Sequence, residues 1–256
     1  MSPRVDYESV CLTRADGITE IRFHTGGGPL VWGGPAHRDA AEVFTAIAQD
    51  HDTRVVIITG TGDSWCTTRN IGPLGGAWEP VYWEGKRILR GLLDIEVPVI
   101  GAVNGPAFYH AEIPLMADIV LAADNAVFAD YSHYTVGAVP GDGANLVWQW
   151  LIGPRRAKYF LMMRAEIGVV EAQRLGFVNE VLPAAHVLPR AWDIARQWAV
   201  KPLPLLRYSR EALNIFERQY LLAGLAGGLA LEGLAYAEAP PAPSGQPAPG
   251  QRSAAR

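Results

Sequence analysis

The sequence predicts an α/β fold in which short strands alternate with helices in the first part of the chain and helices dominate the rest. Two β-rich runs, 9–13 and 18–23, flank a turn with Asp16 and Gly17, which predicts a hairpin with a connection of three to five residues. Continuous apolar runs at 54–59 and 97–103 have the length of strands covered on both faces.

The remaining elements follow from hydrophobic spacing. Helices are expected at 36–49 and 82–93, and short strands at 119–123 and 126–128. The second half is expected to hold one strand at 177–182 among helices at 145–152, 155–163, 170–175, 191–200, 206–216 and 220–236. The last residues are Pro, Ala, Gly and Ser with almost no large apolar side chain, which predicts disorder. We therefore divide the chain into a core at 1–190, a helical C-terminal region at 191–237 and a disordered tail at 238–256.

Composition limits the functional classes. The 256 residues are 49% hydrophobic, enough for a sizeable core, and the net charge of -4 leaves no basic surface for nucleic acid. The N-terminus lacks the apolar segment of a signal peptide, and no uninterrupted apolar run is long enough to cross a bilayer. We expect a cytoplasmic protein that binds neither nucleic acid nor membrane. Cys11 and Cys66 are expected to be buried thiols.

Several familiar motifs fail. A dinucleotide fingerprint starting at Gly60 would need glycine where Trp65 stands, and Cys66 occupies the glycine position of a nucleophile elbow around Ser64. There is no Walker A motif. The six histidines have neither HExxH spacing nor close Cys/His spacing, so we predict no metal site.

One loop places His133 nine residues before Asp142, with glycines and Pro140 between them. A carboxylate beside an imidazole fixes the tautomer of the ring, and the free ring nitrogen can then act as a base near neutral pH. The alternative is a surface histidine and a turn aspartate without a joint role, and spacing alone slightly favours it.

Other polar or aromatic residues stand in suggestive places. His110 follows an Asn-Gly-Pro turn at a strand-to-helix junction, where backbone N–H groups favour developing negative charge, although a core histidine is equally consistent with the sequence. Glu232 lies among small and apolar residues and must be paired or face a cavity or another subunit. For Glu112, a first-turn carboxylate of a helix is preferred. For Trp32, His37 and Tyr82, packing or surface roles are at least as well supported by the residues alone.

At these positions the chain resembles the crotonase (enoyl-CoA hydratase/isomerase) superfamily, from about Tyr7 to Glu238. The matching segments are VVIITGTGDSWC, IEVPVIGAVNGPA, ADIVLAADNAVFAD, GAVPGDGA and EAQRLGFVNEVLP. The resemblance implies a spiral of β-β-α units with a helical C-terminal region that often completes the site. It also implies assembly as a homotrimer or a dimer of trimers.

The chain departs from the acyl-CoA enzymes of that superfamily at three places, one of which is His133, where the hydratases have an acidic catalytic residue. A segment like FSAGADL is replaced by WCTTRNI, with Thr67, Thr68 and Arg69, and a Gly-Gly-Gly run is replaced by Phe108, Tyr109 and His110. These departures argue against CoA thioester chemistry. The sequence is more similar to the 6-oxocamphor hydrolases and related β-diketone hydrolases, through LVW before AH, VNGP before HAEIP, and VPGDGA before LVW.

This narrower resemblance implies a cofactor-independent hydrolase that cleaves a carbon–carbon bond of a cyclic or bicyclic 1,3-diketone in a retro-Claisen reaction. It implies His133 with Asp142 as general base and His110 as the hydrogen-bond donor to a substrate oxygen. Substrate contacts are expected from Trp32, His37, Glu232 and Tyr82. Two alternatives stay open, namely an acyl-CoA hydratase, isomerase or hydrolase, and a catalytically silent scaffold.

Overall fold

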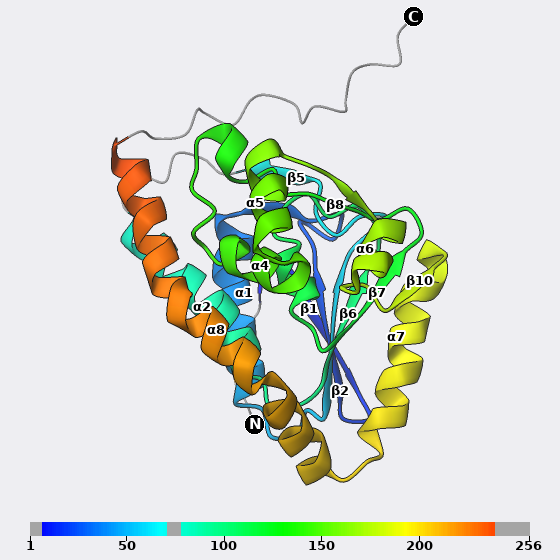
Figure 1. The fold of residues 1–256 in the computed structure, drawn as a ribbon. Helices are drawn as coiled ribbons and strands as arrows, with labels where there is room; N and C mark the ends of the chain where they lie inside the picture. The colour runs from blue at the N-terminus through cyan, green and yellow to red at the C-terminus, as the bar shows by residue number, and fades with distance from the viewer. Residues whose placement is uncertain (1–6, 71–77, 239–256) are drawn as a thin grey trace, which may run out of the picture.

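The computed structural model describes residues 7–70 and 78–238, which form a six-stranded sheet covered by helices on both faces (Figure 1). The strand order is β1 (Val10–Ala15), β2 (Ile18–Phe23), β4 (Val55–Gly60), β6 (Val99–Val103), β7 (Ile119–Ala123) and β10 (Glu180–Leu182). β1 is antiparallel to β2, and the other strands run parallel. The predicted α/β class, with helices dominating the C-terminal region, is confirmed.

The opening hairpin is tighter than predicted. Ala15 pairs directly with Ile18, so only Asp16 and Gly17 connect the strands. Both have positive φ, 53° and 77°, as the two central residues of a type I′ turn require. This turn suits the right-handed twist of the two strands better than the longer connection.

Each strand of the sheet sends alternate side chains to opposite faces. Val55 and Ile57 join Val187, Ala191 and Ala195 of α7 (Ala184–Ala199) in one apolar cluster. On the other face, Val56 and Ile58 belong to the larger cluster that includes side chains of α1 (Gly34–Ala48) and α2 (Glu79–Asp94). All six residues of β4 are buried, as the apolar run predicted.

The loops and short elements that carry polar groups lie at one end of this sheet. Here β3 (Val31–Gly33) pairs with β5 (Thr68–Asn70), and β8 (Val127–Phe128) pairs with β9 (Ile167–Gly168). The short helix α3 (Glu112–Leu115) and the 3-10 helix η1 (Tyr134–Val136) complete the connections. Beside them lie the helices α4 (Ala144–Ile152), α5 (Pro154–Met163) and α6 (Val169–Leu175).

The C-terminal region differs from its prediction. The helices expected at 206–216 and 220–236 are one helix, α8 (Leu203–Glu238), because Glu217, Arg218 and Gln219 between them are good helix formers. The helix expected from 191 begins at Ala184, so the predicted boundary after 190 falls inside α7. Strand β10 covers only the end of the predicted 177–182 strand. Glu238 still belongs to α8, and the remainder of the predicted tail lies outside the described residues.

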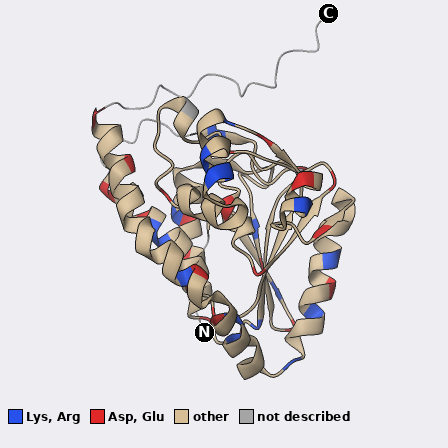
Figure 2. Cartoon of the chain, in the orientation of Figure 1, with Lys and Arg blue, Asp and Glu red and all other residues tan. Residues whose placement is uncertain are grey.

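Helix α8 runs along the left edge of the molecule in Figure 1 and packs against α2 and α4. It is the single helix of the described part that is long and apolar enough to span a membrane by length and composition, with 22% of its most apolar window buried. Leu221, Leu225 and Leu229 form its buried stripe. Charged residues are frequent on the outer helices, and the central strands carry few (Figure 2).

Candidate active site

Five chain segments bring polar side chains together where the strands end. His110 and Glu112 follow β6, and Asp130 and His133 follow β8. Asp142 precedes α4, Trp32 lies in β3 and Glu232 projects from α8. Segments that are far apart in sequence therefore build one polar cluster.

His133 and Asp142, predicted as a pair, are in contact. Nε2 of His133 lies 3.2 Å from Oδ2 of Asp142. On the opposite side of the ring, Nδ1 lies 2.9 Å from both carboxylate oxygens of Asp130. The free ring nitrogen expected from the sequence is therefore absent, because Asp130 takes the second nitrogen.

Two carboxylates around one buried imidazole set its charge. Burial alone would lower the pKa of His133, but Asp130 and Asp142 raise it well above the usual value. Although burial would raise the pKa of Asp142, the neighbouring imidazolium of His133 outweighs it and lowers that pKa. At neutral pH the group is an imidazolium between two carboxylates.

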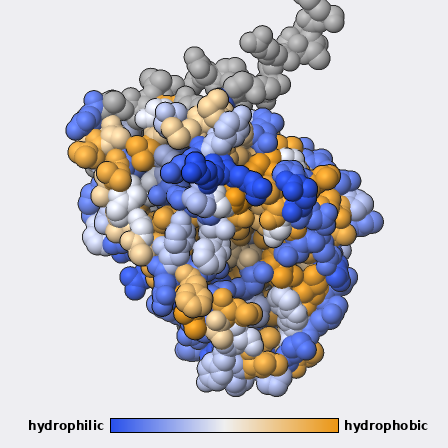
Figure 3. Space-filling model, viewed as in Figure 1, coloured by the Kyte–Doolittle hydropathy of each residue, from blue (hydrophilic) through white to orange (hydrophobic). Residues whose placement is uncertain are grey.

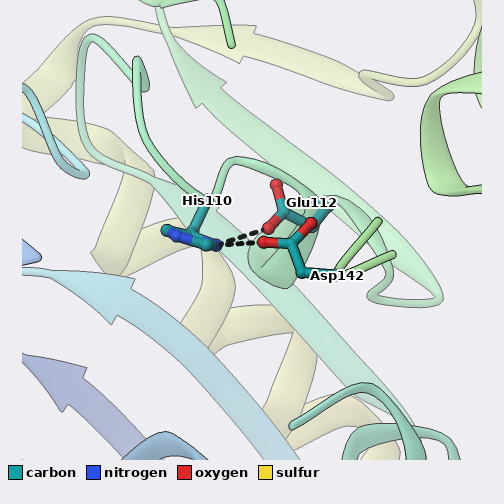
Figure 4. Close-up of side chains that lie close together, drawn as sticks. All are labelled: His110, Glu112 and Asp142. Atoms are coloured by element: carbon teal, nitrogen blue, oxygen red, sulfur yellow. Dashed lines mark hydrogen bonds and ion pairs between the residues drawn. The ribbon is translucent and has the colours of Figure 1, made fainter. Parts of the chain in front are cut away.

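His110 reaches the same aspartate from another direction (Figure 4). Its Nδ1 lies 2.7 Å from Oε1 of Glu112 and 3.6 Å from Oδ2 of Asp142. Both facing atoms are carboxylate oxygens, so Nδ1 carries a hydrogen. Glu112 is the first residue of α3, as predicted, but it also orients this histidine, which the sequence reasoning missed.

The backbone and a tryptophan hold His110 in place. Its φ of 49° lies in the left-handed region, which costs a non-glycine residue roughly 1 to 2 kcal/mol. The ring stacks on Trp32 with centroids 4.0 Å apart and planes at 28°. The indole N–H of Trp65 donates to the carbonyls of Tyr109 and His110 at 3.2 and 3.1 Å. Packing thus maintains a strained backbone.

Glu232 is brought to the cluster by a close approach between α8 and the loop before Asp142. A Cβ placed on Gly141 would lie 2.1 Å from the carbonyl oxygen of Gly228, so only glycine fits there. Oε2 of Glu232 is buried and has no hydrogen-bond partner within the described residues. Burial, and secondly the charge of Asp142, raise the pKa of Glu232 to about 8.

The other two predicted residues lie further out. Nδ1 of His37 is 2.7 Å from Oε2 of Glu84, and its ring lies edge-on to Trp32 with centroids 6.1 Å apart. Tyr82 is half-buried on α2, and the ammonium of Lys86 lies 5.1 Å from its ring centroid. An open hollow of about 350 Å³ near the start of α2 is lined by Glu79, Pro80, Trp83, Glu84 and Arg87. Among the described residues, no contact places Tyr82 within the His110 and His133 cluster.

The cluster contains donor sets that could hold a cation. The ligand atoms of His133, Asp142 and Glu232 lie within 4.8 Å of one another, as do those of His110, Glu112 and Asp142. Sequence spacing gave no sign of this convergence. Both sets share Asp142, which already contacts the two histidines, so the observed contacts need no metal to explain them, and we assign none.

The family model for enoyl-CoA hydratase/isomerase matches residues 36–231, and the chain belongs to this family. Among solved structures, a β-diketone hydrolase from the cyanobacterium Anabaena sp. PCC 7120, bound to (S)-3-oxocyclohexyl acetic acid, is 42% identical with a TM-score of 0.86. The match covers 91% of this chain and 95% of that one.

Curated relatives carry the names of CoA enzymes. Carnitinyl-CoA dehydratase of Escherichia coli is 31% identical over 195 residues, covering 74% of each protein. Human enoyl-CoA delta isomerase 2 is 26% identical over 227 residues, covering 85% of this chain and 57% of that protein. An enoyl-CoA hydratase/isomerase from Mycobacterium paratuberculosis is 25% identical with a TM-score of 0.78, covering 91% of this chain and 95% of that one.

Proposed function

We propose that this protein hydrolyses a carbon–carbon bond of a cyclic or bicyclic 1,3-diketone by a retro-Claisen reaction, giving a keto acid without a cofactor. The observation that carries the proposal is the buried cluster in which His133, His110 and Glu232 surround Asp142. The Anabaena neighbour supports it, since its bound molecule is a cyclohexanone bearing an acetic acid group. Hydrolytic opening of a bicyclic 1,3-diketone gives such a keto acid.

The reaction needs a proton acceptor and donors to oxygen. Water adds to one carbonyl and gives up a proton, the bond to the central carbon breaks, and an enolate of the second carbonyl leaves. That enolate is then protonated at carbon. Because the second carbonyl takes up the electron pair, the substrate supplies its own electron sink and the proposal needs no organic cofactor.

Glu232 is the proton acceptor in this proposal. His133 is protonated between its carboxylates, so it cannot take a second proton, and Asp142 is a weak base because its pKa is lowered. The pKa of Glu232 near 8 makes its carboxylate a stronger base, and its unpartnered Oε2 can hold the attacking water. This role replaces the sequence-based assignment of the base to His133.

The histidines serve as donors to the oxygens that gain charge. The imidazolium of His133 has its Nε2 side toward the cluster. His110 is fixed on Trp32 with Nδ1–H engaged by Glu112, so in this proposal its ring is protonated at both nitrogens and donates to substrate through Nε2–H. Hydrogen bonds preorganised in a buried site strengthen as negative charge develops. In this proposal Trp32 forms the apolar wall of the site on which His110 stacks. His37 packs edge-on against Trp32.

A direct assay tests the proposal. A panel of bicyclic, monocyclic and open-chain 1,3-diketones is incubated with the protein in ¹⁸O-labelled water, and products are analysed by mass spectrometry. The expected result is gain of one labelled water, with the label in the new carboxylate. Absence of ring opening across the panel, with the protein folded, would overturn the proposal.

A CoA-ester enzyme is the second candidate, because the curated relatives are named for CoA substrates. The segment WCTTRNI, which replaces FSAGADL, argues against this candidate. Thr68 to Asn70 form strand β5, and the guanidinium of Arg69 donates to the carbonyl of Ser132 at 3.1 Å. A rise in melting temperature on adding crotonyl-CoA would favour this candidate.

We also propose assembly as a homotrimer or a dimer of trimers. Large apolar side chains are exposed along α8, including Tyr208 at 73%, Leu213 at 82% and Phe216 at 75%. Figure 3 shows apolar residues at the surface over this helix. Exposed apolar surface on a helix can mark an interaction site. Light scattering of the full chain measures the assembly, and a monomer would contradict it.

A further inference from the structure

Asp130 is a buried carboxylate of the His133 cluster that has no role in the proposed reaction so far. It lies two residues after the end of β8 and is 7% exposed. The backbone N–H of Ser132 donates to its Oδ1 at 3.0 Å, and both oxygens face Nδ1 of His133 at 2.9 Å. The carboxylate is therefore fixed by the loop before it meets the imidazole.

These contacts determine which nitrogen of His133 faces the reacting groups. With Nδ1–H donating to Asp130, the opposite nitrogen, Nε2, points to Asp142 at 3.2 Å. In a neutral imidazole held by a carboxylate, loss of that carboxylate allows the wrong tautomer and greatly slows catalysis. In an imidazolium, the same loss removes a charge that favours the second proton. In this chain Asp130 occupies that orienting position, and Asp142 occupies the side where the chemistry is proposed.

We propose that Asp130 is a positioning residue that fixes the orientation and protonation of His133, so that Nε2–H is presented to Asp142 and to substrate. This inference rests on the proposed function for its catalytic consequence but not for its effect on His133 itself. Asp130 does not touch the reacting atoms and acts through the imidazole.

The charges around His133 predict the direction of the effect. Asp130 and Asp142 face its ring, the His110 ring lies 6.3 Å away between centroids, Glu232 approaches from α8, and Arg69 bonds the neighbouring Ser132. Of these, Asp130 contributes the largest favourable interaction with the imidazolium. Without its charge His133 loses its proton at a lower pH.

The test removes the negative charge of Asp130 but keeps a side chain of nearly the same shape. Asp130→Asn retains an oxygen for the Ser132 N–H, and Asp193→Asn, an exposed aspartate of α7, is the matched control. Imidazole ¹⁵N NMR of the substrate-free protein measures the tautomer and titration of His133. We expect D130N to move that titration to lower pH and to lower kcat roughly a hundredfold, with KM changed less. The alkaline limb of the pH profile should move down with the NMR titration.

The outcomes separate the possible failures. An unchanged His133 titration and tautomer in D130N would overturn the inference, whatever the activity. A fall in kcat that follows a fall in melting temperature, with the pH profile superimposable on the parent protein, would show a merely structural role and also overturn it. If the protein cleaves no diketone, the proposed function is refuted. The NMR titration of His133 needs no substrate, so it still tests the role of Asp130.

Discussion

The two histidines of the cluster are held by different forces, although both contact Asp142. His133 is fixed by charge, since Asp130 and Asp142 flank its ring at 2.9 and 3.2 Å. His110 has one close carboxylate, Glu112, but its position depends on the stack with Trp32 and on a backbone with positive φ. The surroundings of His133 set its protonation state, whereas the surroundings of His110 set the position of its ring.

This difference predicts different responses to perturbation. Changes of pH or of carboxylates should act through His133, because its pKa depends on them. Changes of volume or backbone freedom should act through His110, because a close-packed wall holds it. The same reaction step can therefore be weakened in two ways that are separable by measurement.

The largest effect is expected from removing the imidazole of His133. H133A should lower kcat for diketone cleavage roughly a thousandfold or more, since the site loses a preorganised charged donor. It should also destabilise the protein by about 3 kcal/mol, because Asp130 and Asp142 are left buried without their partner. Steady-state kinetics and chemical denaturation measure both. H186A, at an exposed histidine of α7, is the control, and turnover of H133A within about tenfold of the parent would contradict the assignment.

A pair of variants at His110 separates its chemistry from its backbone. H110A and H110G should both lose about a hundred- to a thousandfold in kcat, because each removes the same donor. They should differ in stability, with H110G the more stable by roughly 1 kcal/mol, since glycine adopts a φ of 49° without strain. Denaturation of the two proteins measures the difference. Equal stabilities would refute the claim that the backbone here is strained.

Local patterns predicted the fold well where a single segment contains the signal. A few consecutive residues are enough to indicate the apolar strands β4 and β6 and the hairpin of β1 and β2. The continuous α8 was missed because an apolar stripe interrupted by charged residues reads as two helices, although nothing at Glu217 to Gln219 breaks one.

The site was only partly predictable, for a physical reason. The resemblance selected His110, His133, Asp142 and Glu232, and the structure brings these four together. Asp130 could have been found from its place three residues before His133 at the end of a strand. The partners Glu112 and Glu84 depend on how the loops and helices fold, so the spacing of residues along the chain carries little sign of them.

Glu232 gives a prediction for pH that involves no histidine variant. Its folded-state pKa of about 8 lies above the ordinary value of 4.5, so between these pH values the folded protein holds a proton that the unfolded chain releases. Stability should fall as pH rises through this window. E232Q should remove that dependence and gain on the order of 1 kcal/mol at alkaline pH, or about 2–4 °C in Tm.

The same variant should lose activity, because the proposed proton acceptor is gone, whereas activity of the parent protein should rise as pH approaches about 8. Melting curves and kinetics over a series of buffers measure both. E211Q, at an exposed glutamate of the same helix, is the matched control. A pH-independent stability difference between E232Q and the parent protein would contradict the raised pKa.

The smallest effect is expected at the wall beneath His110. Trp32 and Trp148 are both buried tryptophans of the main core, so W32F and W148F should lose similar stability, about 1 to 2 kcal/mol for the volume removed. Only Trp32 stacks on His110, so only W32F should lower kcat, by roughly three- to tenfold, as the imidazole gains freedom. Kinetics of the two variants at matched fractions of folded protein distinguish packing in general from packing that positions a donor. An equal loss of kcat in both would mean that His110 does not depend on this stack.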